Sequence, residues 1–270
     1  MRELVAAAAA RGAQMVVFPE AFVGGYPKGT HFGTVLGGRL PGAREWFRRY
    51  HVAAVDLPGP ELDEIRAAAR ENGVVLVAGV VERDGATLYC TAVFVGPGGE
   101  WLGRHRKIVP TAAERMVWGQ GDGSTLTVVD TPVGRVGAVI CWENYLPLLR
   151  SAMYAKGIDV WCAPTVDGTD GWTASMRHIA LEGRCFVVSA NQFARRRDYP
   201  ADFPTVDGDD PETVVLRGGS CVVDPLGNLI AGPVFDREEI LVADLDLGEQ
   251  QRVRDSLPAS QHRRRDLFTY

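Results

Sequence analysis

Cys141 is the residue of this chain best suited to covalent chemistry, because it directly follows the apolar run 137–140. The run predicts a buried strand that brings a thiol to a turn, and residues 145–157 predict a helix closed by Lys156 and Gly157. Such a position suits a nucleophile. A lone cysteine after a strand is nevertheless more often a small buried hydrophobe, so its neighbours must decide its role.

Two further predicted strands end in charged side chains. Residues 15–18 predict a short buried strand that Pro19 stops before Glu20, and Lys107 follows the strand-like residues 91–103. If the three strands lay in one sheet, a carboxylate, an ammonium and a thiol would converge at one edge. A thiol with a pKa of about 8.5 is mostly protonated at neutral pH and needs a base or a cation beside it. Glu20 can accept its proton, and Lys107 can stabilise the negative charge that then develops on the substrate.

Each of these polar residues also has a plainer interpretation. A glutamate after a strand is usually a solvated loop residue, and Lys107 follows the Arg-His-Arg run 104–106, which is typical of a basic surface face. Glu143, two positions after the cysteine, is placed to cap the start of the next helix, where the dipole favours a carboxylate. His178 is expected to be a structural hydrogen-bonding residue.

Four longer segments place these residues in a common context. They are FPEAFVGGYPKG, HRKIVPTAAERMVWGQGDGS, GAVICWENYLPLLRSAMYAKG and WTASMRHIALEGRCFVVSANQF, and they cover most of residues 15–193. In content and order they resemble segments of the nitrilases, the nitrile-cleaving branch of the carbon-nitrogen hydrolase superfamily. Several long segments in register make this resemblance very specific.

The resemblance implies a role for each of four residues. Glu20 matches the family's general base, Cys141 its nucleophile, and Lys107 the lysine that stabilises charge and donates a proton. Glu114, seven positions beyond Lys107, matches a second glutamate that positions substrate and assists the lysine. The backbone N–H of Trp142 at the helix start is the expected partner of Lys107 in binding the developing anion.

The same resemblance implies that Tyr26, Trp142 and Trp172 line the substrate pocket, where aromatic walls accept apolar nitriles. Each of the three is equally compatible with a place in the hydrophobic core. Residue types alone do not distinguish an aliphatic, an aromatic or an arylacetic nitrile.

The chemistry implied is hydrolysis of a nitrile to the carboxylic acid and ammonia, through a thioimidate and an acyl-enzyme on Cys141, with no metal or organic cofactor. An amidase or carbamoylase of the same superfamily uses the same four residue types, but it usually has an aspartate in place of Glu143. Cyanide-consuming relatives tend to have His in place of Asn144. An inactive, truncated family member is a further alternative, against which the four intact residues argue.

Composition and charge fit a globular enzyme. At 270 residues and 46% hydrophobic content, with no dividing linker, residues 1–270 are expected to form a single domain. The net charge of −5 predicts neither nucleic acid nor an anionic membrane as a partner, and no apolar run approaches the roughly 20 residues that span a bilayer. The five cysteines show no CxxC spacing, so zinc and disulfides are not expected, and their odd number predicts a cytoplasmic protein.

Strands and helices alternate along the chain, but hairpins interrupt the rhythm, so we expect an α/β fold with a two-sheet core and helices on both outer faces. The resemblance makes this a four-layer α-β-β-α sandwich that forms homodimers or larger homo-oligomers through its outer helices. It also implies that the chain lacks the family's first strand, and that the tail 257–270 keeps the family's basic and aromatic residues. The predicted elements are helices 2–11, 60–73, 145–157 and 172–183, strands 14–18, 74–82, 88–96, 127–141, 158–164, 185–191 and 239–247, and a hairpin over 220–233.

Overall fold

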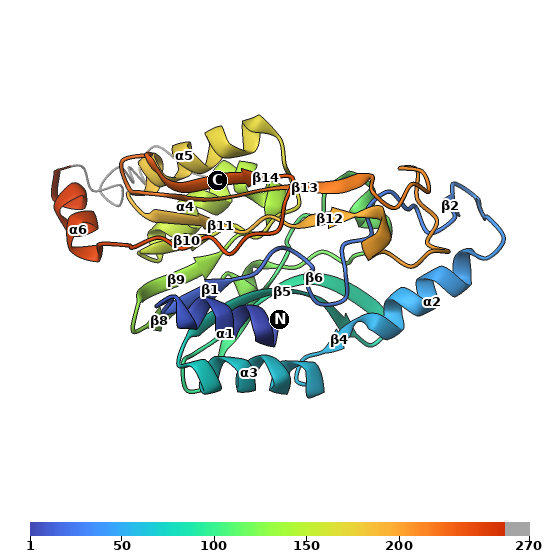
Figure 1. Cartoon of the computed structure of the whole chain (residues 1–270), viewed down its shortest axis with the longest axis horizontal. Coiled ribbons are helices and arrows are strands. Elements are labelled where there is room, and N and C mark those ends of the chain that lie inside the picture. The colour runs from blue at the N-terminus through green and yellow to red at the C-terminus, as the bar shows by residue number, and fades with distance from the viewer. Residues whose placement is uncertain (257–270) are drawn as a thin grey trace.

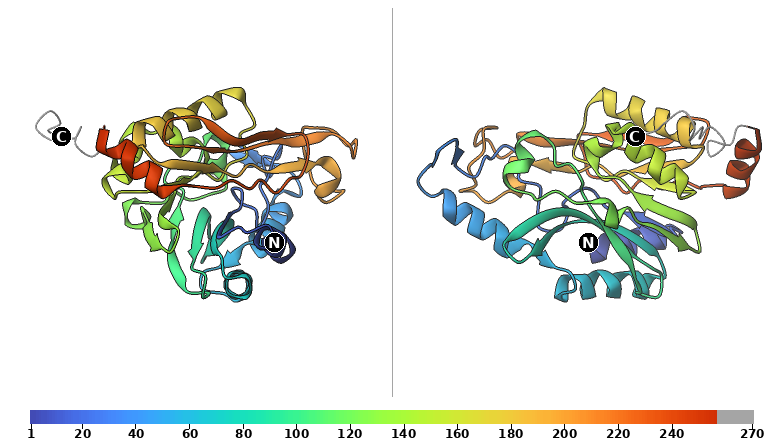
Figure 2. Two further views of the ribbon diagram at one scale, coloured as in Figure 1. Left: turned by 60° about the vertical axis from the view of Figure 1, so that its left-hand side comes forward. Right: turned by 180° about the vertical axis from the view of Figure 1, so that it is seen from behind.

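Two β-sheets lie face to face in the computed structural model, which describes residues 1–256, and helices cover the outer face of each sheet (Figure 1). Figure 2 shows the same layers from two further directions. The predicted α-β-β-α sandwich is therefore confirmed. The basic and aromatic tail over residues 257–270 lies outside the described residues.

The first sheet has the strand order β1-β5-β6-β7, with the short β4 beside β5, and β1 forms its edge within residues 1–256. Helices α1 (Arg2–Ala10) and α3 (Pro60–Asn72) cover its outer face (Figure 1). As predicted, α3 ends at Gly73, whose φ of 63° is a left-handed conformation that glycine adopts without strain. The strands are β1 (Met15–Val17), β4 (Val55–Asp56), β5 (Val75–Asp84), β6 (Thr87–Val95) and β7 (Trp101–Arg106).

The second sheet has the strand order β12-β13-β11-β10-β9-β8, with β14 beside β13. Helices α4 (Pro147–Ala155) and α5 (Asp170–Gly183) cover its outer face (Figure 1). Its central strands β9, β10 and β11 run parallel, and such strands are apolar because both their faces are buried. The strands are β8 (Val128–Thr131), β9 (Gly134–Ala138), β10 (Val160–Cys162), β11 (Phe186–Ser189), β12 (Phe193–Arg195), β13 (Val214–Val223) and β14 (Leu229–Phe235).

Several smaller elements were not predicted. Helix α2 carries Phe47 and Tyr50 at helical spacing, and both pack half-buried against the inner core, so a helical pattern was present but not recognised. The 3-10 turns are too short for a helical period to emerge. These elements are the short strands β4 and β12 together with β2 (Thr34–Val35), β3 (Gly38–Arg39), α2 (Ala43–Ala53), α6 (Leu247–Ser256), η1 (Ala112–Met116), η2 (Gly123–Thr125), η3 (Cys141–Tyr145) and η4 (Arg196–Asp198).

Alternate residues of each strand divide the core into three apolar layers. In β5, Val77 faces the second sheet, whereas Leu76 packs under α1 and α3. In β10, Cys162 faces the first sheet, whereas Trp161 packs under α4 and α5. The strand period of two therefore produces one inner layer between the sheets and two outer layers beneath the helices.

Two predicted strands differ from the structure. The run 127–141 folds into the hairpin of β8 and β9, because Pro132 cannot donate a ladder hydrogen bond and ends β8. The strand predicted over 239–247 is wrong, since residues 239–246 have no partner strand within the described chain. This segment is instead held by Arg11, whose guanidinium donates to Ile240 O at 2.6 Å.

The two charged residues and the cysteine come from both sheets. Glu20 follows β1 and Lys107 follows β7, and these strands run in the same direction because two antiparallel pairings separate β7 from β5, the parallel partner of β1. Cys141 follows β9 of the second sheet. The single-sheet arrangement considered above is therefore wrong, and the residues approach one another from two facing sheets.

Gly79 of β5 allows the segment that carries Glu20 to lie directly on the sheet. A methyl group added at this position would come within 2.8 Å of Glu20 Cα and of Ala21 N. We therefore expect Gly79→Ala to lower the free energy of unfolding by about 1–3 kcal/mol, the usual cost of overpacking a filled core. Urea unfolding followed by circular dichroism measures this change.

The control is Gly171→Ala in the exposed first turn of α5, where an added methyl meets only the Thr169 hydroxyl, at 3.8 Å. This substitution should leave the free energy of unfolding unchanged or raise it by about 0.5–1 kcal/mol. Equal stability of the two variants would contradict the close contact at Gly79.

Candidate active site

A buried ammonium lies between two carboxylates at the centre of the candidate site. Lys107 Nζ donates hydrogen bonds to Glu20 Oε1 and to Glu114 Oε2, each at 2.7 Å. The side chains of Lys107 and Glu20 are fully buried, and that of Glu114 is nearly so. A charge in such surroundings persists only when it is paired. Each of the three side chains therefore depends on the other two.

Backbone hydrogen bonds hold the segments that carry these residues. Lys107 N donates to Cys90 O at 2.8 Å, which extends the ladder of β6 and β7 to the lysine itself. Glu20 follows β1, and its backbone packs directly on Gly79 of β5. Glu114 lies on η1, where its Oε2 also accepts from Thr111 N at 2.6 Å. The cluster is therefore built on the ends of strands and on one fixed turn.

Cys141 has a φ of 52°, a left-handed conformation that costs a non-glycine residue about 1–3 kcal/mol. Asn144 holds this turn, because its Nδ2 donates to Cys141 O at 2.7 Å and to Val139 O at 2.8 Å. The Oδ1 atom of Asn144 accepts from the buried Trp161 indole at 2.8 Å. Backbone strain at a residue with a reactive side chain is typical of an active site.

The helix predicted over residues 145–157 is shorter than expected, and a separate 3-10 turn precedes it. Residues Cys141–Tyr145 form η3, and α4 begins only at Pro147, whose fixed φ and missing N–H suit a first helical turn. The break leaves the side chains of Trp142 and Tyr145 about half exposed beside the buried thiol.

Burial and charge set the protonation of the thiol and of its candidate base. Burial raises the pKa of Cys141, and the Glu20 carboxylate raises it further. Burial also raises the pKa of Glu20 above its ordinary value of 4.5, against the opposing effect of Lys107. The resting site therefore holds a neutral thiol near a carboxylate with increased proton affinity, as general-base chemistry requires.

The second oxygen of Glu20, Oε2, is the atom available to take a proton. It is buried, and no group within residues 1–256 meets the geometry of a hydrogen bond to it. Cys141 is close enough to lower the pKa of Glu20 as a hydrogen-bond donor does. The two side chains are therefore neighbours whose contact falls short of a full hydrogen bond, and catalytic contacts of this kind tighten when substrate binds.

Lys107 keeps its proton in this environment. Burial by itself lowers the pKa of Lys107, but the carboxylates of Glu20 and Glu114 outweigh burial, and the pKa lies well above its ordinary value of 10.5. The lysine is therefore an ammonium at neutral pH, able to stabilise a developing anion or to donate a proton to it.

Glu143 connects the two facing sheets. Its Oε2 accepts from Ile140 N at 3.0 Å, so the predicted capping contact is confirmed. The same buried carboxylate also accepts from Ile108 N at 2.5 Å and pairs with His105 Nε2 at 3.0 Å. Because Ile108 and His105 flank Lys107, one carboxylate sets the distance between the lysine and the cysteine-bearing turn.

His105 is buried, although the sequence predicted an exposed position. The run Arg104-His105-Arg106 predicted a basic surface face, but side chains alternate along β7 and His105 is fully buried. Its Nδ1 lies 2.9 Å from Thr125 O. Burial lowers the pKa of His105, yet the Glu143 carboxylate outweighs this effect and the pKa is raised. The two-residue period of a strand was the signal that could have identified this inward position.

Tyr26 is the predicted pocket residue that contacts the cluster directly. Its hydroxyl donates to Glu114 Oε1 at 2.8 Å, on the opposite side of that carboxylate from Lys107. The ring lies against Trp118, with centroids 5.7 Å apart. Tyr26 therefore orients Glu114 and is half-buried beside it.

The other two predicted pocket residues lie at different depths. Trp142 is 51% exposed, and its indole N–H donates to Asp167 Oδ2 at 2.8 Å. Trp172 is 1% exposed, and its indole N–H donates to Ser189 Oγ at 2.9 Å. Both rings contact Tyr145. Trp172 lies in the core on the inner side of Tyr145, and Trp142 lies at the surface.

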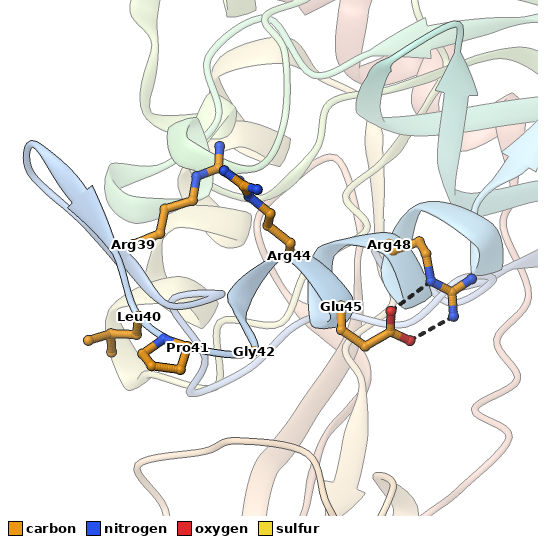
Figure 3. A pocket seen from close by; sticks show the side chains of 7 residues that line it. All are labelled: Arg39, Leu40, Pro41, Gly42, Arg44, Glu45 and Arg48. Atoms are coloured by element: carbon orange, nitrogen blue, oxygen red, sulfur yellow. Dashed lines mark hydrogen bonds and ion pairs between the residues drawn. The ribbon is translucent and has the colours of Figure 1, made fainter.

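A cavity of about 620 Å³ lies at the start of α2 and shares no residue with the cluster (Figure 3). Figure 3 shows Glu45 turned toward Arg48, with which it forms a surface ion pair at 2.7 Å that contributes little to stability. This cavity is therefore separate from the Lys107 cluster. The cavity is lined by Arg39, Leu40, Pro41, Gly42, Arg44, Glu45 and Arg48.

The remaining features that bear on function are any metal-ligand cluster, any long apolar helix, the cysteines and His178. Within residues 1–256 no set of three or more His, Cys, Asp or Glu side chains is arranged to hold a metal ion, and no helix is long and apolar enough to cross a membrane. All five cysteines are buried and free. His178 is exposed on α5 and pairs with Glu182 at 3.7 Å, one turn along the helix, as expected of a structural residue.

Comparison with known proteins identifies the family. Residues 1–255 match the carbon-nitrogen hydrolase family, and the chain therefore belongs to it. The chain is 56% identical over 255 residues to a bifunctional nitrilase/nitrile hydratase of Nicotiana tabacum, and the match covers 93% of this chain and 73% of that protein. It is 51% identical over 258 residues to nitrilase 2 of Arabidopsis thaliana (93% and 76%) and 53% identical over 266 residues to an aliphatic nitrilase of Sinorhizobium fredii (98% and 86%). The resemblance to the nitrilase branch is thereby confirmed.

Solved structures share the fold at lower identity. The NitFhit protein of C. elegans has a TM-score of 0.75 at 22% identity, and the match covers 99% of this chain and 61% of that one. An amidase of Nesterenkonia sp. has a TM-score of 0.70 at 21% identity, covering 98% and 86%. This chain thus spans less than two thirds of the NitFhit chain. Both structures support the four-layer fold.

The raised pKa of Glu20 predicts how the reactivity of Cys141 depends on pH. A carboxylate accepts the thiol proton only when it is ionised, and burial moves its pKa upward from 4.5. We therefore expect the rate of Cys141 alkylation by iodoacetamide to fall about tenfold per pH unit below a midpoint that lies above pH 4.5. Mass spectrometry of the labelled peptides measures the rate and should show Cys141 labelled far faster than the other four thiols.

Glu20→Gln removes the base and should abolish this acid limb together with most of the labelling. Glu45→Gln on the exposed face of α2 is the control and should keep the wild-type profile. A midpoint at or below pH 4.5, or rapid labelling in Glu20→Gln, would rule out Glu20 as the proton acceptor.

Proposed function

We propose that this protein is a nitrilase that hydrolyses a small-molecule nitrile to the carboxylic acid and ammonia, with Cys141 as the nucleophile. The observation that carries the proposal is a buried Lys107 ammonium bonded to both Glu20 and Glu114, near a cysteine held in a strained turn. Identities between 50% and 56% to proteins named as nitrilases support the nitrile as substrate. The mechanism that follows uses protein groups and water alone.

In the first step the thiol proton of Cys141 passes to Glu20 while the sulfur attacks the nitrile carbon. One π bond of the nitrile opens, and its nitrogen takes a proton from Lys107. The product is a thioimidate on Cys141. The proton now on Glu20 returns to the lysine through their 2.7 Å hydrogen bond, which restores the starting charges. A neutral thiol with a raised pKa suits this transfer, because its proton leaves only as the sulfur bonds to carbon.

Water completes the reaction in two further steps. Glu20 removes a proton from a water molecule that adds to the thioimidate carbon, and the nitrogen takes a proton from Lys107, which recovers it from Glu20. The hydroxyl of the tetrahedral intermediate then gives its proton to Glu20 as the carbonyl forms, while Lys107 protonates the nitrogen a second time and ammonia leaves. A second water molecule, activated in the same way, cleaves the thioester to the carboxylic acid and restores the Cys141 thiol. Lys107 and the backbone N–H of Trp142 stabilise the negative charge of each intermediate.

Glu114 and the aromatic residues position the reacting groups. Glu114 holds Lys107 on the side opposite Glu20 and is itself held by the Tyr26 hydroxyl. Burial and the Glu114 carboxylate raise the pKa of Tyr26, so this hydroxyl remains a donor. Tyr26 and Trp142 line the entry to the thiol in this proposal. A contact of Trp172 with substrate stays a prediction, because its ring lies behind Tyr145.

We further infer that residues 1–270 act as one domain, in the cytoplasm and as a homodimer or larger homo-oligomer. The shared inner core of the two sheets supports one domain. The outer helices support self-association, since Leu148 of α4 is 67% exposed and Leu181 of α5 is 42% exposed. Contiguous apolar surface is typical of an interface. Sedimentation equilibrium would reveal the assembly, and a monomer would contradict it.

Cys141→Ala should abolish formation of acid and ammonia from every nitrile, with a loss of at least about 10³-fold in rate, because no other group can form the thioimidate. Ammonia release is measured together with acid and amide by chromatography, on matched aliphatic, aromatic and arylacetic nitriles and on the corresponding amides. Cys185→Ala, a buried thiol in the core under α5, is the control and should keep most of its rate.

Full activity of the Cys141→Ala variant would refute the nucleophile. Ammonia from the amides with none from the nitriles would instead identify an amidase that uses the same cysteine. Amide that accumulates from a nitrile would indicate the hydratase activity for which the tobacco relative is named.

Lys107→Met should remove turnover and lower the free energy of unfolding. The substitution leaves two buried carboxylates without their cation, and breaking a buried pair in this way costs about 3–5 kcal/mol. Turnover must therefore be measured at a temperature at which near-ultraviolet circular dichroism reports a folded variant. Lys156→Met at the exposed end of α4 is the matched control. A folded Lys107→Met variant with most of its rate would exclude the lysine from the mechanism.

A further inference from the structure

A threonine hydroxyl touches the sulfur of the proposed nucleophile. Thr165 follows β10, its side chain is fully buried, and its Oγ1 lies 3.2 Å from Cys141 Sγ. Neither Glu20 nor Lys107 makes a comparable hydrogen bond to this sulfur within the described chain. Thr165 is therefore the polar side chain in direct contact with the reacting atom.

The other contact of the hydroxyl leaves its hydrogen available to the sulfur. Thr165 Oγ1 accepts a hydrogen bond from Asp167 N at 3.0 Å. A threonine hydroxyl has a single hydrogen and two acceptor lone pairs. The amide of Asp167 occupies one lone pair, so the hydrogen is free to point to Cys141 Sγ. The hydroxyl can thus donate to the sulfur, and it is the donor of this pair once the sulfur has lost its own proton.

Backbone hydrogen bonds of the second sheet impose this contact. Cys141 N donates to Pro164 O at 2.9 Å, directly before the threonine. Thr165 N in turn donates to Ala190 O at 2.9 Å, and Thr165 forms an isolated bridge with Asn191. The hydroxyl and the sulfur are therefore held by the register of neighbouring chain segments.

We propose that Thr165 is a further catalytic residue, whose hydroxyl donates a hydrogen bond to Cys141 Sγ and stabilises the thiolate as the thiol proton passes to Glu20. This inference rests on the proposed role of Cys141 as nucleophile. Glu20 then removes the proton from one side of the sulfur while Thr165 supports the resulting negative charge from another.

Ionisation of Cys141 Sγ strengthens this hydrogen bond as the sulfur attacks the substrate. Hydrogen bonds to an ionised acceptor are about twice as strong as those between neutral groups. The bond is therefore weak to the resting thiol and strong to the attacking sulfur, which lowers the barrier to attack. In the resting site it already opposes the burial that raises the pKa of Cys141.

The test compares Thr165→Val with Thr165→Ser. Valine has the shape of threonine without the hydroxyl, whereas serine keeps the hydroxyl without the methyl. We expect Thr165→Val to slow both alkylation of Cys141 by iodoacetamide at pH 7 and nitrile hydrolysis by about tenfold or more, since hydrogen bonds to charged groups are of that strength. Thr165→Ser should restore most of both rates. Wild-type rates in Thr165→Val, or equal losses in the two variants, would overturn the proposal.

Thr169→Val is the matched control on the same loop. It removes an exposed hydroxyl that makes no capping hydrogen bond at the start of α5, and it leaves the Thr165 hydroxyl beside the sulfur. Alkylation of Cys141 should then stay at the wild-type rate. A loss as large as that of Thr165→Val would assign the effect to loop movement and overturn the proposal.

The same assays distinguish this inference from the proposed function. Nitrile hydrolysis that is lost in Cys141→Ala but unaffected in Thr165→Val would refute only the role of the threonine. The wild-type protein could instead hydrolyse no nitrile while Thr165→Val still slows alkylation. That result would support the hydroxyl–sulfur interaction and refute only the proposed substrate.

Discussion

The ammonium of Lys107, buried between the carboxylates of Glu20 and Glu114, is the interaction on which the rest of the site depends. Removing an ammonium from water costs several kcal/mol, and two contacts of 2.7 Å offset that cost only where water is excluded. The three residues come from two strand ends and a 3-10 turn. The sandwich must therefore bring these segments together before any chemistry is possible.

A second constraint joins the two sheets at the site. The Glu143 carboxylate binds backbone amides on both sides, those of Ile108 and Ile140, and pairs with His105. Lysine and cysteine therefore keep their separation although they belong to different sheets. The strained turn at Cys141, held by Asn144, keeps the sulfur near Glu20, the proposed base. In this way two buried side chains that bind backbone groups set the geometry of the proposed reaction.

The geometry and the comparisons answer different questions about function. A base, a cation and a thiol in this arrangement suit attack on a nitrile or on an amide, because both substrates place a partial positive charge on carbon beside nitrogen. Identity to nitrilases over nearly the whole chain favours the nitrile. The contacts of the sulfur with Thr165 and of Glu114 with Tyr26 then explain how this chain supports its four reactive groups.

The sequence by itself determined the features that depend on near neighbours along the chain. Apolar periods located β5, β6 and β10, Gly73 ended α3, and four residue types in matched segments identified Glu20, Lys107, Glu114 and Cys141 as candidates. Only the tertiary structure decided that these residues approach from two sheets, that His105 is buried, and that residues 239–246 have no partner strand within the described chain. It also placed Thr165 against the sulfur. Local periodicity reports which face of an element is apolar, but a strand's partner, the burial of a charge and the contacts of a thiol arise between residues far apart in the chain.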